Sequence, residues 1–179
     1  MTDDQLTIES AVTAAGNAAC YLRWTGAGVL LEPPVVLATA HGLNAAASRA
    51  ETDIALIDVL RDRVRMDIQA IAAMLREVRT ARPLPAARVA LRIEAVAGAG
   101  TGLPYVHIAR GTMKASLSPD AAREMAGHWI EAAVAAQLDA RLRYVLGEHD
   151  QITSTDVEDI FAGMRRAAGT DPQLTEGTP

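Results

Sequence analysis

The sequence predicts a mainly helical α+β protein that combines one long helix with a small antiparallel β-hairpin or three-stranded meander. Half of its 179 residues are hydrophobic but only 3% are aromatic, so the core must consist mainly of Ala, Val, Leu and Ile. A core of these aliphatic side chains suits close-packed helices. Apolar residues recur at heptad spacing in the first half, and the apolar period then changes to two, which is typical of strands.

The long helical segment is predicted over residues 35–82, between Pro33-Pro34 and the next prolines at 83 and 85. Prolines fit the first turn of a helix, where no amide donor is needed. Every seventh residue from Val36 to Val78 is apolar, as a helix–helix seam requires. The predicted oligomer or partner seam comprises Ile54, Ile57, Val64, Ile68, Ile71, Leu75 and Val78. It needs a partner helix, from the same chain or from a second copy.

One helix or two helices in this segment both fit the pattern. Gly42 and Asn44 weaken it, and Ser48 with Glu51 forms a capping box that would start a new helix. A break or kink is therefore expected between residues 42 and 48.

The flanking regions predict shorter elements. Residues 6–19 resemble a first helix, residues 89–95 and 105–109 a β-hairpin, and residues 113–117 a third strand. Ser118-Pro119 begins a helix that runs to about residue 144 and buries Met125, Trp129, Ala133, Ala136 and Leu142. A last helix runs from Thr155 to Gly169 and buries Val157, Ile160, Phe161 and Met164. The predicted regions are thus a helical part at 1–85, a hairpin with two helices at 86–169, and a disordered tail at 170–179.

The net charge of −5 is unevenly distributed, because the basic residues gather between residues 59 and 115 while both ends are acidic. On a single continuous helix, Arg61, Arg65, Arg76 and Arg79 would fall within about 60° of one another. This predicted basic patch can follow phosphates. The alternative is a solvated helix flank neutralised by acidic segments, which the acidic total and the absence of interleaved aromatic residues favour.

Catalytic and metal-binding patterns are lacking. His41, His107, His128 and His149 have no spacing that places a metal-binding pair on one helix face. No glycine-rich phosphate loop joins a strand to a helix. Catalytic, cofactor-binding and metal-ligating residues are accordingly all predicted as none.

A hairpin followed by Leu117-Ser-Pro-Asp-Ala-Ala-Arg123 and an alanine-rich helix resembles a unit of small uncharacterised proteins of actinobacteria and their phages. The resemblance covers about sixty residues and implies no activity, but it suggests a phage or mobile-element protein. Residues 26–41 resemble the histidine segment of trypsin-like proteases, yet no nucleophile loop completes a triad. Trp24-Thr-Gly26 and a Tyr144 motif resemble type VII secretion substrates, whose two-helix hairpin conflicts with the prolines here.

Two functions remain. The first is a non-enzymatic interaction or assembly protein that self-associates or binds a helical partner through its long helix. The second is a nucleic-acid-associated regulator that uses the arginine flank. A single cysteine and an acidic N-terminus without a signal-peptide pattern predict a cytoplasmic protein. The sequence has no uninterrupted apolar run of about twenty residues, so no membrane span is predicted.

Overall fold

The computed structural model describes residues 6–81, 89–98 and 103–169, and within them the chain repeats one pattern of three strands and two helices. The first copy contains β1 (Thr7–Val12), β2 (Ala18–Trp24), β3 (Ala27–Leu31), α1 (Pro33–Asp62) and α2 (Ile68–Ala81). The second contains β4 (Arg92–Ala97), β5 (Pro104–Arg110), β6 (Met113–Leu117), α3 (Pro119–Gly147) and α4 (Ser154–Gly169). Each trio of strands forms an antiparallel meander, in the orders β1-β2-β3 and β4-β5-β6.

The two copies correspond residue by residue. Pro33 and Pro119 begin the long helices 86 positions apart (119 − 33), and the same offset relates their buried residues. Buried in α3 are Pro119, Ala122, Ala126, Trp129, Ala132, Ala133 and Ala136. Their counterparts in α1 are Pro33, Val36, Ala40, Leu43, Ala46, Ala47 and Ala50, and all of these are buried too. The fold is therefore an internal repeat, although the two copies share few identical side chains outside these positions.

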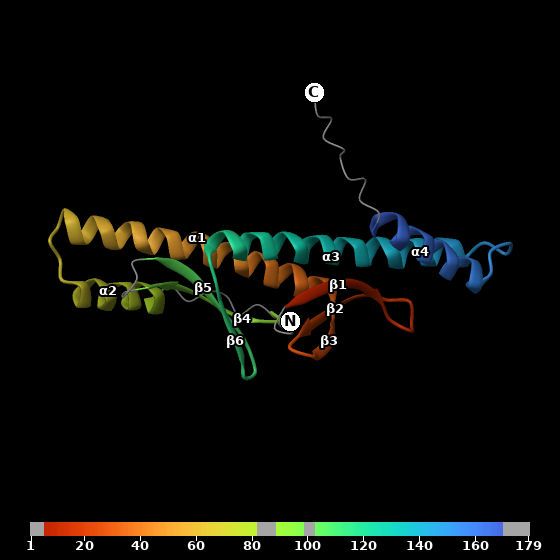
Figure 1. Ribbon diagram of the computed structural model, residues 1–179, viewed down its shortest axis with the longest axis horizontal. Helices are drawn as coiled ribbons and strands as arrows, with labels where there is room; N and C mark the ends of the chain where they lie inside the picture. Colours follow the sequence, from red (N-terminus) through yellow and green to blue (C-terminus); the bar gives the residue numbers. More distant parts are fainter. Residues whose placement is uncertain (1–5, 82–88, 99–102, 170–179) are drawn as a thin grey trace, which may run out of the picture.

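The two long helices lie side by side and run in opposite directions along the middle of the molecule (Figure 1). Each helix packs mainly on the sheet of the other copy: α1 contacts β4 and β5, and α3 contacts β1 and β2. The shorter helices α2 and α4 pack on the far parts of α1 and α3, at opposite ends of the molecule (Figure 1). Neither sheet is covered by its own helix alone.

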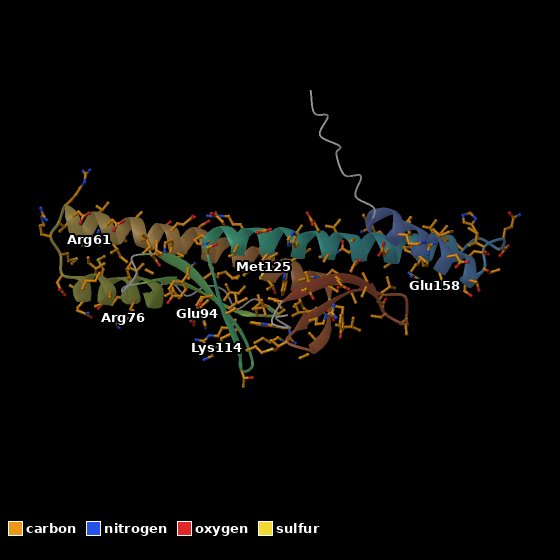
Figure 2. The ribbon with its side chains drawn as sticks, in the orientation of Figure 1. Arg61, Arg76, Glu94, Lys114, Met125 and Glu158 are labelled. Carbon is orange, nitrogen blue, oxygen red and sulfur yellow. The ribbon has the colours of Figure 1, made fainter. Side chains whose placement is uncertain are left out.

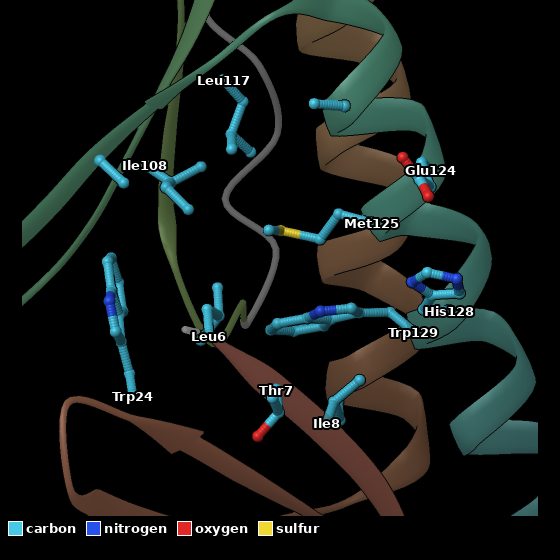
Figure 3. A pocket seen from close by; sticks show the side chains of 12 residues that line it. Leu6, Thr7, Ile8, Trp24, Ile108, Leu117, Glu124, Met125, His128 and Trp129 are labelled. Atoms are coloured by element: carbon cyan, nitrogen blue, oxygen red, sulfur yellow. The ribbon is translucent and has the colours of Figure 1, made fainter. Parts of the chain in front are cut away.

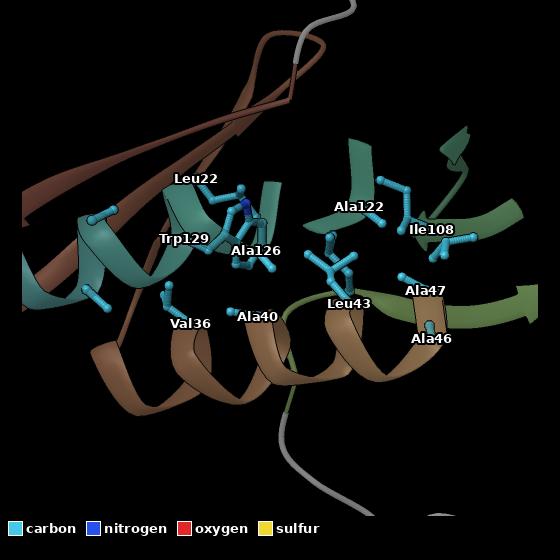
Figure 4. Close-up of a cluster of buried hydrophobic side chains, with 14 of the residues drawn as sticks. Leu22, Val36, Ala40, Leu43, Ala46, Ala47, Ile108, Ala122, Ala126 and Trp129 are labelled. Atoms are coloured by element: carbon cyan, nitrogen blue, oxygen red, sulfur yellow. The ribbon is translucent and has the colours of Figure 1, made fainter. Parts of the chain in front are cut away.

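Alanine sets the close approach of α1 and α3. Ala40, Ala47, Ala126 and Ala133 are fully buried, and the side chain of Trp129 fills the space between the helices and the first sheet (Figure 4). Small residues at a helix–helix contact let the backbones pack closely, while the large indole supplies much of the buried apolar area. The aromatic-poor composition is consistent with this core.

The segment 35–82 forms two helices, and the break between them lies elsewhere than predicted. α1 continues through residues 42–48 and ends at Asp62. Arg65 then adopts a left-handed conformation (φ 61°), and the Met66 amide donates to the Leu60 carbonyl over 3.1 Å. The Asp67 carboxylate accepts from the Gln69 amide at 2.8 Å and begins α2. The apolar residues at heptad positions on the two sides of the break face each other: Ile57 of α1 packs with Ile71 and Leu75 of α2.

Gly42 serves packing and does not end the helix. A Cβ at this position would lie 3.1 Å from Cδ1 of Ile93 on β4, so glycine lets the second sheet approach α1. The predicted Ser48 capping box does not form, because Ser48 lies inside the helix and its carbonyl accepts the Thr52 hydroxyl at 2.8 Å. The two signals for a break therefore have other physical causes.

The predicted first helix over residues 6–19 is wrong, because this segment forms β1 and the start of β2. The two strands pair in register from Thr7 with Arg23 to Val12 with Ala18. A tight turn joins them, in which the Asn17 carbonyl accepts the Thr13 amide at 2.9 Å and Gly16 has a φ of 80°. An alanine-rich strand resembles a helix in sequence, and only the partner strand decides between the two.

The second half follows the prediction more closely. The three strands after residue 89 form the expected antiparallel meander, and the Ser118 side chain caps α3 by accepting the Ala121 amide at 3.1 Å. The cap of α4 lies earlier than predicted, since Thr153 and Asp156 exchange hydrogen bonds. These bonds lower the pKa of Asp156. Of the predicted buried residues, Leu142, Ile160 and Met164 are exposed.

Thr39 joins α1 to the segment before β4 and carries a testable contribution to stability. Its fully buried hydroxyl accepts the Ala90 amide at 2.8 Å and donates to the Val35 carbonyl at 2.7 Å. Thr39→Val keeps the shape but leaves the Ala90 amide without this acceptor, so we expect a loss of about 1–3 kcal/mol in the free energy of unfolding by urea. Thr52→Val removes a similar but exposed bond and should change stability by less than about 0.5 kcal/mol. Equal effects would refute this role of Thr39.

Candidate interaction surface

The predicted seam finds its partner helices within the chain. Ile57, Ile71 and Leu75 are buried together between α1 and α2, with Ile54 and Ile68 half-buried beside them. The first half of the seam, from Val36 to Ala50, packs against α3. Of the predicted seam residues, only Val64 and Val78 are well exposed, at 61% and 59%. Most of the seam is therefore already covered by helices of the same chain.

The four arginines of the predicted basic patch lie on different elements. Arg61 is on α1, Arg65 is in the connection after it, and Arg76 and Arg79 are on α2 (Figure 2 labels Arg61 and Arg76). Arg61 also donates to Asp58 and Asp62 at 2.9 Å each. The break after Asp62 thus removes the single helix face on which the patch was predicted, and this arrangement does not favour a nucleic-acid-binding surface.

The outer face of α3 carries the most continuous row of exposed apolar side chains. We define this outer face by four residues, whose exposed fractions are 47%, 52%, 41% and 53%: Val134, Leu138, Leu142 and Val145. At 100° per residue they fall within about 80° of one another, roughly opposite the alanines that α3 buries. Because hydrophobic side chains are usually buried, a row of them on the solvent-exposed side of a helix indicates a contact surface.

The repeat supplies an internal comparison for this face. The positions of α1 that correspond to Val134 and Leu138, 86 residues earlier, are Ser48 and Thr52. The fold therefore tolerates polar side chains at these two sites. Leu142 and Val145 correspond to Leu56 and Val59, which are exposed as well, at 38% and 49%, so the apolar character that is particular to α3 is that of Val134 and Leu138. Sequence reasoning missed the face because it assigned Leu142 to the core. The available signal was the alanine row of Ala126, Ala133 and Ala136 on the opposite side of the same helix.

Two charged residues flank the apolar row on the same side of α3. Glu131 precedes Val134 and Arg141 follows Leu138, and both side chains are exposed. If a second α3 runs antiparallel and level with residue 136, Val134 lies opposite Leu138 and Glu131 lies opposite Arg141. In this register Leu142 and Val145 lie opposite Ile130 and Gly127, so the part of the face around residue 136 is complementary to itself in charge under a two-fold axis, as an isologous dimer contact requires.

Reactive groups are sparse in the described parts of the chain. No group of three His, Cys, Asp or Glu side chains there lies close enough together to hold a metal ion. Cys20 is fully buried in β2, and this burial raises the pKa of its thiol to about 11. Among the described helices, none is long and apolar enough to cross a bilayer.

Comparisons with known proteins add no further assignment. No family model matches the chain, and neither a curated protein nor a solved structure is significantly similar to it.

Proposed function

We propose that this protein is a non-enzymatic interaction protein that self-associates through the outer face of α3. The observation that carries the proposal is the exposed row from Val134 to Val145, on a helix whose opposite side already fills the core. Burying apolar surface is the main favourable term in most protein association. A second copy is the proposed partner because Glu131 and Arg141 are spaced to pair across a two-fold axis.

Light scattering after size exclusion tests the proposal directly. We expect the full chain, of 18.9 kDa, to show about twice that mass, and Leu138→Asp to show the monomer mass because a buried unpaired carboxylate prevents the contact. The matched control is Thr52→Asp, at the corresponding position of α1, which should keep the dimer mass. A monomeric wild type, or a Leu138→Asp variant that stays dimeric, would contradict the proposal.

A charge exchange distinguishes self-association from binding of an unrelated partner. Glu131→Arg should weaken the dimer, because each of two symmetric contacts then places two arginines opposite each other. Glu131→Arg combined with Arg141→Glu should restore the dimer, because each new arginine again lies opposite a glutamate of the second copy. An unrelated partner would not carry the compensating change. The expected change is about fivefold in the dimer dissociation constant for each exposed pair. Failure of the double variant to recover would exclude the antiparallel arrangement.

A further inference from the structure

A cleft of about 510 Å³ lies between the two sheets and the start of α3, away from the outer face of α3 (Figure 3). Both tryptophans of the chain line it: Trp24 from the end of β2 and Trp129 from α3. Leu6 and Met125 also line it, and Met125 and Trp129 point from the helix toward Leu6 (Figure 3). A mainly apolar cavity of this size with a few polar groups at its edge is typical of a small-molecule site.

The polar groups of the cleft come mostly from one turn of α3. Glu124 is the one carboxylate among the residues that line it, and His128 follows four residues later on the same side of the helix. Within the described part of the chain, Glu124 forms no ion pair, since its neighbour Arg123 pairs with Glu51 and Asp120 instead. The cleft therefore combines a mainly apolar wall with an unpaired negative charge at its edge.

The other copy of the repeat shows which of these features the fold does not need. A recess of about 410 Å³ occupies the corresponding place, and Leu31, Val35 and Arg110 line it where the cleft has Leu117, Ala121 and Trp24. Arg110 donates to the Ala90 carbonyl at 3.4 Å. Arg110 thus has in the recess the position that Trp24 has in the cleft.

The helix positions differ in the same way. Glu124 and His128 correspond to Ala38 and Gly42, 86 residues earlier, while the alanines of the helix crossing are kept. The acidic side chain of Glu124 is therefore not a requirement of the fold, whereas Trp24 and Trp129 belong to the hydrophobic core. The recess also has a carboxylate, Glu32, but Arg110 lines it too, whereas no Lys or Arg is among the residues that line the cleft. An apolar wall beside a carboxylate without a neighbouring cation favours a ligand with apolar substituents and a positive charge.

We propose that the cleft binds a small apolar molecule that carries one positive charge, such as an alkyl or aryl ammonium compound. The apolar part lies against Leu6, Ile8 and Met125, whose side chains are half-buried, and the ammonium group lies at the edge near Glu124. This site is separate from the outer face of α3, so it goes beyond the proposed self-association and can stand or fall independently.

Intrinsic fluorescence reports on this site because both fluorescent indoles line it. We would titrate the full chain with three probes that share a ten-carbon chain, below their micelle concentrations: decyltrimethylammonium, decyl maltoside and decyl sulfate. The expected result is a saturable fluorescence change, with the cation binding at least about fivefold more tightly than the neutral probe. Glu124→Gln should remove this preference and leave the neutral probe unchanged, whereas Glu148→Gln, at the exposed end of α3, should have no effect.

A pair of filling variants locates the binding. Ala115→Leu adds bulk to a residue that lines the cleft, and we expect it to weaken all probes by about tenfold or more. Val29→Leu changes the corresponding residue of the first copy and should leave binding unchanged. Far-ultraviolet circular dichroism of each variant checks that it is folded. Equal affinity for the three probes would overturn the charge preference, and the absence of saturable binding, or binding unaffected by Ala115→Leu, would overturn the site.

Discussion

Separating the two copies of the repeat is expected to unfold both of them. α1 packs mainly on β4 and β5, and α3 packs mainly on β1 and β2, so residues 1–85 and 86–179 each lose the helix that covers their sheet. Each fragment also loses the alanine-lined contact between the long helices. Since a domain is only marginally stable, by about 5–15 kcal/mol, removing half of the core exceeds what either fragment can lose.

Circular dichroism and thiol reactivity measure this outcome. In the intact chain Cys20 is buried with its thiol pKa raised from 9.0 to about 11, so at pH 8 its thiolate population should be roughly a hundredfold lower than that of an ordinary thiol. The isolated first fragment should alkylate at the rate of an unfolded peptide and unfold without a cooperative transition. Mixing or co-expressing the fragments should restore slow alkylation. A first fragment that folds cooperatively as a monomer would show that the predicted division near residue 85 separates two independent domains.

Trp129→Ala is expected to have the largest effect of any single substitution on stability. Trp129 is 1% exposed and is the largest of the fully buried side chains, in contact with the core that joins α1, α3 and the first sheet (Figure 4). Truncating a buried aromatic residue leaves a cavity and removes apolar burial, which costs about 3–5 kcal/mol. The measurement is the urea midpoint, followed by circular dichroism.

Tyr144→Ala provides the matched control for this substitution. Tyr144 is on the same helix but is 70% exposed, so its loss should change the free energy of unfolding by less than about 0.5 kcal/mol. A destabilisation by Trp129→Ala of less than about 1 kcal/mol would mean that the helix–sheet contact can close around the missing indole. In that case the packing described for the centre of the molecule would be wrong.

Local chemistry was readable from the sequence where one short segment contains all the necessary groups. Ser118-Pro119 begins α3 because the hydroxyl and the amide that it caps are three residues apart. The strands after residue 89 alternate and are joined by short connections, so their pairing is also local. The α+β class with helices and an antiparallel meander followed from these signals.

The first sheet and the helix break were decided by contacts that a sequence pattern does not contain. Residues 7–12 form a strand because β2 pairs with them and α3 covers them, and β2 is in turn paired with β3. Gly42 was read as a weak point, whereas its role is to admit Ile93 from a strand fifty-one residues later (93 − 42). The repeat was hidden as well, because it preserves burial at an offset of 86 residues while most side chains differ.

The heptad seam shows this division most clearly. The sequence by itself indicated an apolar stripe over residues 36–78 that needs helical partners, and in the structure most of this stripe is covered while Val64 and Val78 are exposed. Only the tertiary structure decided which helices these are: α3 for the first half and α2 for the second. The physical reason is that the hydrophobic effect is non-directional, so an apolar stripe is stabilised by any apolar surface that covers it. Chain connectivity and the fit of neighbouring surfaces select which helix does so.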